Sequence, residues 1–188
     1  MSTTPLTLSF AGQQPPIALP QVPGTRGPVG VDMRGLNQSG FCSYDPGFAN
    51  TAGCQSAISW IDTENSVLLH RGYPVDQLAR QCDFLEVAYI MLNGDAPDEA
   101  SYQTFRETIT RHTLVHEQIA RMCSGFRRDS HPMALMCALV GALAAFYHDV
   151  LDVENPQHRA LAATRLLSKM PTIAAMSYKY TIEQPAAY

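Results

Sequence analysis

Residues 131–148 read HPMALMCALVGALAAFYH, a long stretch without Asp, Glu, Lys or Arg. Charged residues flank it on both sides, with Arg127, Arg128 and Asp129 before it and Asp149 and Asp152 after it. The stretch has about the minimum length for a membrane span, but its alanine, cysteine and glycine content is only weakly apolar. We therefore predict a buried core helix that begins near Pro132, with Asp129 or Ser130 as its N-cap.

The segment before this core helix shows helical spacing from Asp76 onward. Apolar residues recur at helical intervals between residues 85 and 92, and Gly94 is a suitable helix stop. Asp98 suits the N-cap of a second helix, which we expect to continue to about Met122.

The segment after the core helix predicts another helix, beginning after Asn155 and Pro156 and reaching Ser168. Pro171 is expected to kink or break it before a last helical run, residues 173–180. This pattern stays apolar close to the end of the sequence, so we expect another chain or a continuation of this chain to cover it.

The first 40 residues differ from the rest because they are rich in Pro, Gly, Thr and Val. Short β-prone runs at residues 6–10 and 29–33 lie between these helix breakers. We predict a small β-rich region over residues 1–50 and a helical region over residues 51–188. The helical region should open with a hairpin of residues 57–62 and 66–70. The predicted fold class is mainly α.

Composition excludes several broad classes of function. With 188 residues, 46% hydrophobic and 16% charged, the chain suits a globular domain and not a disordered one. Its net charge of −4 gives no basic surface for nucleic acid, so no nucleic-acid or membrane partner is expected. The five cysteines form no C-x-x-C pair and indicate reduced thiols in the cytoplasm.

Cationic residues at helical spacing indicate an anion site. Arg165 and Lys169 are four residues apart, so both should project from one helix face, and Arg111 with His112 forms a second pair. The two pairs could converge on a nucleotide phosphate, with a ring or hydroxyl from Tyr147. The alternative is that these cations are merely solvated.

A metal site is not expected. His112 and His116 would lie at i and i+4 on one helix face, but the order His-Glu-x-x-His is absent, because Ala120 stands where the second histidine is required. We interpret these histidines as partly buried side chains bonded to their neighbours. The sequence also contains no P-loop, nucleophile elbow or G-x-G-x-x-G motif.

Many runs of residues, in fixed order, resemble citrate synthase, and in particular its hexameric, NADH-inhibited bacterial branch. The resemblance covers residues 40–188, and the β-rich start is also typical of that branch. The matching runs include Tyr44-Asp-Pro-Gly-Phe48, Ser59-Trp-Ile-Asp62, Leu68-Leu-His-Arg-Gly-Tyr-Pro-Val-Asp-Gln-Leu78, Thr110-Arg-His-Thr113, Phe126-Arg-Arg-Asp-Ser-His-Pro-Met133, Gly141-Ala-Leu-Ala-Ala-Phe-Tyr-His148 and Leu166-Leu-Ser-Lys-Met-Pro-Thr172.

The resemblance implies condensation of acetyl-CoA with oxaloacetate to give citrate and free CoA. In the family an aspartate and two histidines transfer protons and polarise carbonyls. The histidines lie in His-Gly-Gly-Ala and Gly-His-Arg-x-Tyr stretches that this sequence lacks. We therefore expect no catalytic residue here. The chain resembles the N-terminal part of a citrate synthase, under half of it, and should be inactive alone.

The resemblance also implies an allosteric site for NADH, with no other cofactor. Its nucleotide-contacting residues map onto Arg111, His112, Thr113, Tyr147, Arg165 and Lys169. This group includes the cations chosen above from spacing. The family further implies a homo-oligomer, a dimer or hexamer, in the cytoplasm.

Two alternatives stay open from the sequence. The chain could be a non-catalytic module that binds a nucleotide or another subunit through its exposed helices. It could also belong to 2-methylcitrate synthase, a related enzyme that uses propionyl-CoA, although the β-rich start argues against this.

Overall fold

The computed structural model describes residues 4–12 and 15–185. The chain forms two compact units, Met1–Asp83 and Phe84–Tyr188. The sequence placed the start of the helical region at residue 51, before the expected hairpin. In the structure that hairpin belongs to the first unit, because it continues into a third strand and contacts the first helix.

The first unit contains short antiparallel strand pairs. Strand β1 (Leu6–Leu8) pairs with β2 (Ile17–Leu19), and β3 (Gln21–Val22) pairs with β4 (Gly30–Val31). Two 3-10 helices follow, η1 (Met33–Ser39) and η2 (Pro46–Phe48). Leu19 of β2 and Leu36 of η1 are buried where these two elements pack together. The predicted β-rich start is therefore present but modest in extent.

The predicted hairpin is confirmed as part of a three-stranded sheet of β5 (Ser59–Asp62), β6 (Val67–His70) and β7 (Tyr73–Pro74). The Asp62 carboxylate closes its turn by accepting hydrogen bonds from the backbone N–H and the side-chain amide of Asn65, at 3.0 and 2.8 Å. Helix α1 (Val75–Gln81) follows the sheet at once.

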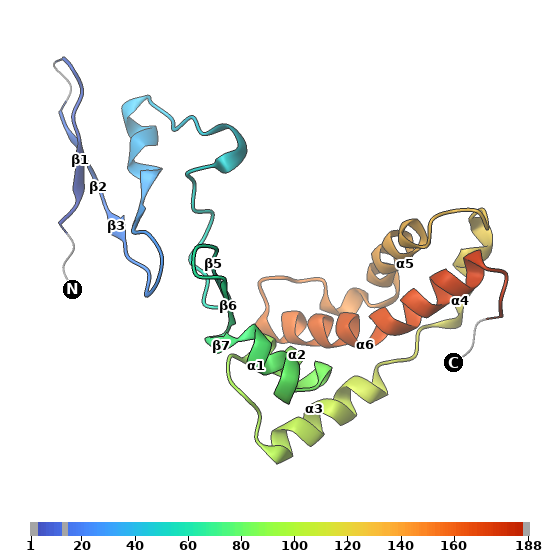
Figure 1. The fold of residues 1–188 in the computed structure, drawn as a ribbon. Coiled ribbons are helices and arrows are strands. Elements are labelled where there is room, and N and C mark those ends of the chain that lie inside the picture. Colours follow the sequence, from blue (N-terminus) through green and yellow to red (C-terminus); the bar gives the residue numbers. More distant parts are fainter. Residues whose placement is uncertain (1–3, 13–14, 186–188) are drawn as a thin grey trace. The chain divides into compact units, whose positions relative to one another are not determined.

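The second unit is helical, and the mainly α fold class is confirmed. Helix α6 (Pro156–Thr181), coloured orange to red in Figure 1, contacts α3 (Glu99–Arg111) and α5 (Pro132–Phe146), and the short helix α4 (Glu117–Met122) contacts α5. A buried cluster from α4, α5, α6 and neighbouring turns forms the core: Val115, Ile119, Cys123, Leu139, Leu143, Ile173 and Met176. The helices are α2 (Phe84–Asn93), α3 (Glu99–Arg111), α4 (Glu117–Met122), α5 (Pro132–Phe146) and α6 (Pro156–Thr181), with 3-10 helices η3 (Cys123–Gly125) and η4 (His148–Val150).

The boundaries around α2 and α3 agree with the sequence only in part. Gly94 follows α2 with φ of +100°, a backbone conformation that favours glycine. The Asp98 carboxylate accepts a hydrogen bond from the Ser101 N–H at 2.7 Å, which confirms it as the N-cap of α3. The expected continuous helix to Met122 is wrong, because residues 112–116 are not helical and separate α3 from α4.

Two further expectations about helix ends are wrong. Helix α5 is capped by His131, whose Nδ1 accepts a hydrogen bond from the Met133 N–H at 3.2 Å, and not by Asp129 or Ser130. Of the two outcomes expected at Pro171, a kink or a break, the break does not occur, because α6 is helical through residue 181. Buried Lys169 and Ile173 on either side pack this part of α6 into the unit, and that packing outweighs the hydrogen bond that proline removes.

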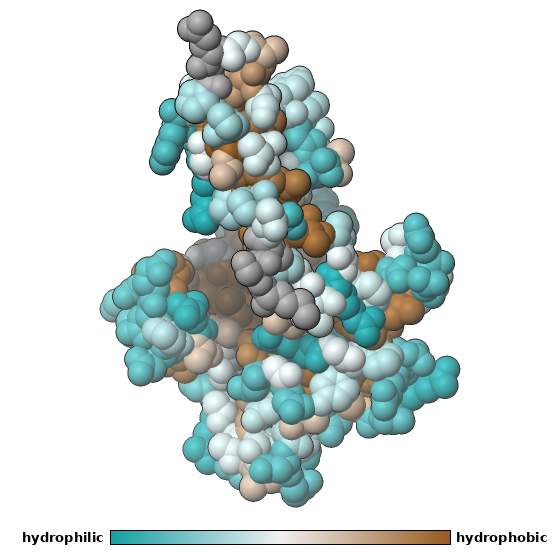
Figure 2. Space-filling view, turned by 90° about the vertical axis from the view of Figure 1, so that its left-hand side faces the viewer, coloured by the Kyte–Doolittle hydropathy of each residue, from teal (hydrophilic) through white to brown (hydrophobic). Residues whose placement is uncertain are grey.

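Hydrophobic side chains also reach the surface of both units, as the brown areas of Figure 2 show. Exposed examples are Tyr44 and Phe48 in the first unit and Phe84, Leu166 and Tyr178 in the second. Among the described residues, no helix combines the length and the apolar character that crossing a membrane requires.

Candidate anion-binding site

Arg165 and Lys169 project from the same face of α6, as their spacing predicted. The Arg165 Cζ and the Lys169 Nζ each lie 4.9 Å from the centroid of the Tyr147 ring. Tyr147 is the C-cap of α5, so this helix end brings the ring to both cations. Because an aromatic face attracts cations, the ring stabilises two positive charges that would otherwise repel each other.

Lys169 is buried, with 3% of its surface exposed, and its ammonium is bound to the chain itself. The Nζ donates hydrogen bonds to the carbonyl oxygens of His112 and Leu114, at 2.7 and 2.5 Å. One turn later, the Thr172 hydroxyl donates to the Thr113 carbonyl at 3.0 Å. Helix α6 thus binds three successive carbonyls of residues 112–114, which accounts for the interruption between α3 and α4.

Arg165 forms a two-pronged ion pair with Asp149 of η4. Its two terminal nitrogens donate to the two carboxylate oxygens of Asp149 at 2.8 and 2.9 Å. This pairing lowers the pKa of Asp149 and raises that of Arg165. The Arg165 side chain is 16% exposed and that of Asp149 is 56% exposed, so the cation is the more enclosed partner. The Arg165 Nε is buried without a hydrogen-bond partner among the described residues.

His112 lies close enough to Arg165 and Lys169 for their positive charges to affect its pKa. Partial burial lowers the pKa of its imidazole, and the positive charges of Lys169 and Arg165 lower it further. The neutral ring is therefore favoured, and a neutral imidazole offers one donor and one acceptor.

The other two predicted site residues make local contacts with α3. The Arg111 side chain is 78% exposed and pairs with Glu107 at 3.2 Å. The Thr113 hydroxyl donates to the Thr110 carbonyl at 2.9 Å. The structure therefore brings His112, Tyr147, Arg165 and Lys169 together, whereas Arg111 and the Thr113 hydroxyl contact residues of α3.

His112 and His116 do not lie on one face of a single helix in the structure. His112 is the C-cap of α3 and His116 is the N-cap of α4, so the two residues do not share a helix. Expecting them at i and i+4 of one helix was wrong for that reason. Within residues 4–12 and 15–185, no group of three His, Cys, Asp or Glu side chains is arranged to hold a metal.

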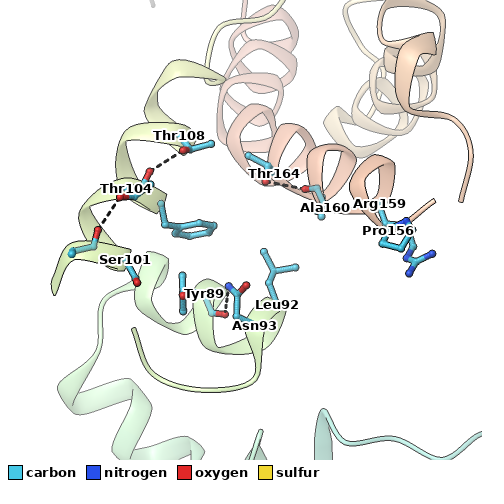
Figure 3. Close-up of a pocket in the computed structure, with 13 residues that line it drawn as sticks. Tyr89, Leu92, Asn93, Ser101, Thr104, Thr108, Pro156, Arg159, Ala160 and Thr164 are labelled. Atoms are coloured by element: carbon cyan, nitrogen blue, oxygen red, sulfur yellow. Dashed lines mark hydrogen bonds between the residues drawn. The ribbon is translucent and has the colours of Figure 1, made fainter. Parts of the chain in front are cut away.

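A second candidate for ligand binding is a cavity of about 740 Å³ between α2, α3 and α6 (Figure 3). Its threonines Thr104, Thr108 and Thr164 donate their hydroxyl protons to carbonyls four residues earlier in their own helices. Arg159 at its edge donates to two carbonyls of the preceding loop. Arg159 is the one cationic residue among the described residues that line this cavity, whereas Arg165 and Lys169 lie together over the Tyr147 ring, so the cavity is less suited to an anion than the Arg165 cluster.

Solved structures with a similar fold are citrate synthases. That of Pyrobaculum aerophilum is 25% identical, covers 76% of this chain and has a TM-score of 0.69. That of Thermoplasma acidophilum, a ternary complex with carboxymethyl coenzyme A and oxaloacetate, is 21% identical over 77% of this chain, with a TM-score of 0.70. That of Thermotoga maritima MSB8 is 22% identical over 74%, with a TM-score of 0.61. The matches cover 38%, 38% and 35% of those chains.

The sequence places the chain in the same class. The family model described as citrate synthase, C-terminal domain, matches residues 47–188, well over half of the chain. This chain belongs to the citrate synthase family.

Proposed function

We propose that this chain is part of a citrate synthase that condenses acetyl-CoA with oxaloacetate, and that it carries an allosteric NADH site in place of catalytic residues. Family membership and the citrate synthase fold support the enzyme class. The hexameric, NADH-regulated bacterial type, a cytoplasmic location and assembly into a homo-oligomer are part of the same proposal.

The observation that carries the nucleotide site is the cluster of Tyr147, Arg165 and Lys169 beside His112. A guanidinium binds phosphate oxygens in the same two-pronged geometry in which Arg165 holds a carboxylate. The Tyr147 ring offers a flat apolar surface beside the cations, and the neutral His112 ring can both donate and accept hydrogen bonds.

Lys169 has a different role in this proposal. Two of its three ammonium protons are used by the carbonyls of His112 and Leu114, so it is a positioning residue for residues 112–114. Arg111, the last residue of α3, and Thr113 are included in the proposed site because the family resemblance implies them, although their side chains contact residues of α3.

Titration of NADH fluorescence tests the site. We expect NADH to bind the chain, and Arg165→Ala to weaken binding at least tenfold, because a charged two-pronged contact is removed. Arg121→Ala is the matched control, since Arg121 is an exposed arginine paired with Glu117 on α4. Equal affinity of the two variants would remove Arg165 from the site.

The catalytic part of the proposal has its own test. The family's two histidine-containing stretches do not occur among these 188 residues, so the chain alone should not catalyse the condensation. Incubation with acetyl-CoA, oxaloacetate and a thiol reagent should release no CoA above the rate of a blank. Release that depends on both substrates would contradict this expectation.

A further inference from the structure

The guanidinium proposed to bind phosphate already holds an anion of the chain itself. Asp149 presents both carboxylate oxygens to the terminal nitrogens of Arg165, at 2.8 and 2.9 Å. Carboxylate and phosphate use the same pair of guanidinium donors. A phosphate can therefore make this two-pronged contact with Arg165 only after the Asp149 carboxylate has left.

The two partners of this ion pair are held very differently. Arg165 projects from the middle of the long helix α6, lies over the Tyr147 ring and is only 16% exposed. Asp149 belongs to the three-residue helix η4, and its side chain is 56% exposed. Water can solvate the carboxylate once it is released, whereas the cation stays fixed by the helix and the ring.

The surrounding charges favour an anion with more charge than one carboxylate. Lys169 lies over the same Tyr147 ring, and its charge and that of Arg165 both act on His112. Asp149 supplies one negative charge, whereas two cations lie over the Tyr147 ring. A phosphate or diphosphate group carries more charge than the carboxylate and can replace it.

We propose that Asp149 is an internal competitor that occupies Arg165 in the empty site and so lowers the affinity of the site for phosphate groups. The identity of the ligand as a nucleotide rests on the proposed function, but the competition applies to any phosphate that uses the Arg165 guanidinium. Asp149 thereby sets the ligand concentration at which the site fills, without itself contacting the bound ligand.

The test measures binding of inorganic pyrophosphate by calorimetry to the whole chain and to two variants. Asp149→Asn keeps the shape of the side chain and removes its charge. Asp152→Asn removes the same charge three residues away, and an asparagine there can still accept the hydrogen bond that Asp152 accepts from the Glu154 N–H. We expect Asp149→Asn to bind pyrophosphate about three- to tenfold more tightly than Asp152→Asn. Asp149→Ser should behave as Asp149→Asn does.

The outcomes separate this inference from the proposed function. If Asp149→Asn and Asp152→Asn bind pyrophosphate equally, or if neither binds it measurably, the competitor role is refuted, whatever NADH does. If pyrophosphate binds more tightly to Asp149→Asn but NADH binds to no form of the chain, the competitor role stands and the NADH site is wrong. Circular dichroism of each variant must match that of the parent chain.

Discussion

Lys169 offers the most direct test of how α6 holds the site together. Replacing it with methionine keeps the length and apolar stem of the side chain but removes two hydrogen bonds from a charged donor. Each such bond contributes about 1.5–3 kcal/mol, so two would contribute about 3–6 kcal/mol if nothing else changed. Residues 112–114 can turn their carbonyls toward water, since the Leu114 residue is 67% exposed. We therefore expect a net loss of about 2–4 kcal/mol in the free energy of unfolding.

Urea denaturation followed by circular dichroism measures this loss. The control is Lys179→Met, the same chemical change at a half-buried position on the same helix. We expect Lys179→Met to stay within about 0.5 kcal/mol of the parent chain, as changes away from such networks usually do. If the two variants unfold at the same urea concentration, the ammonium of Lys169 does not anchor residues 112–114, and the positioning role is refuted.

Three further predictions concern the core, a helix cap and pH. Leu139→Ala in the centre of α5, where the side chain is fully buried, should lower the free energy of unfolding by about 2–5 kcal/mol in urea denaturation; a change under about 1 kcal/mol would contradict its place in the core. Asn155→Ala should lower the free energy of unfolding by about 1 kcal/mol in urea denaturation, because the Asn155 side chain accepts hydrogen bonds from two N–H groups of α6. Asn155→Ser should retain most of this free energy, since serine is also a good N-cap, and equal losses in the two variants would argue against the cap. Burial and two nearby cations lower the pKa of His112 in the folded chain. As the pH falls below about 6.5, the unfolded chain therefore binds a proton at His112 more readily than the folded chain does, and the free energy of unfolding decreases. Urea titrations between about pH 8 and 5.5 should then show a smaller loss for His112→Gln than for the parent chain, and an equal loss would show that His112 is not the group responsible.

The sequence predicted the features that depend on neighbouring residues. Arg165 and Lys169 share a face because they are one helical turn apart, and a helix between Pro156 and residue 181 guarantees that spacing. Asp98 caps α3 because an aspartate at this place accepts a hydrogen bond within its own turn. Both the shared helix face and the capping hydrogen bond are set by residues of a single helix.

The features that the sequence did not predict depend on distant parts of the chain. Residues 112–116 have enough helical pattern to suggest one long helix, and the interruption is stabilised by Lys169 and Thr172, more than fifty residues later. Asp149 was noted only as a charged residue after the core helix, because a partner sixteen residues away across a loop has no signature in spacing. His131 was overlooked as a cap because imidazole is not among the usual capping groups.

The charge of Asp149 is the one signal that could have pointed to the ion pair. An aspartate two residues after Tyr147, at the end of the helix that supplies the ring, lies near any cation that the ring attracts. A charged residue next to a cluster of cations can therefore be an internal partner of that cluster and not only a solvated group.

A crystal structure of the chain grown with NADH would show whether the Arg165 cluster binds the nucleotide. We expect the nucleotide's diphosphate within hydrogen-bond distance of the Arg165 guanidinium, beside the Tyr147 ring, with the Asp149 carboxylate turned away. Density for NADH in the cavity between α2, α3 and α6, with the Arg165–Asp149 ion pair intact, would contradict this expectation.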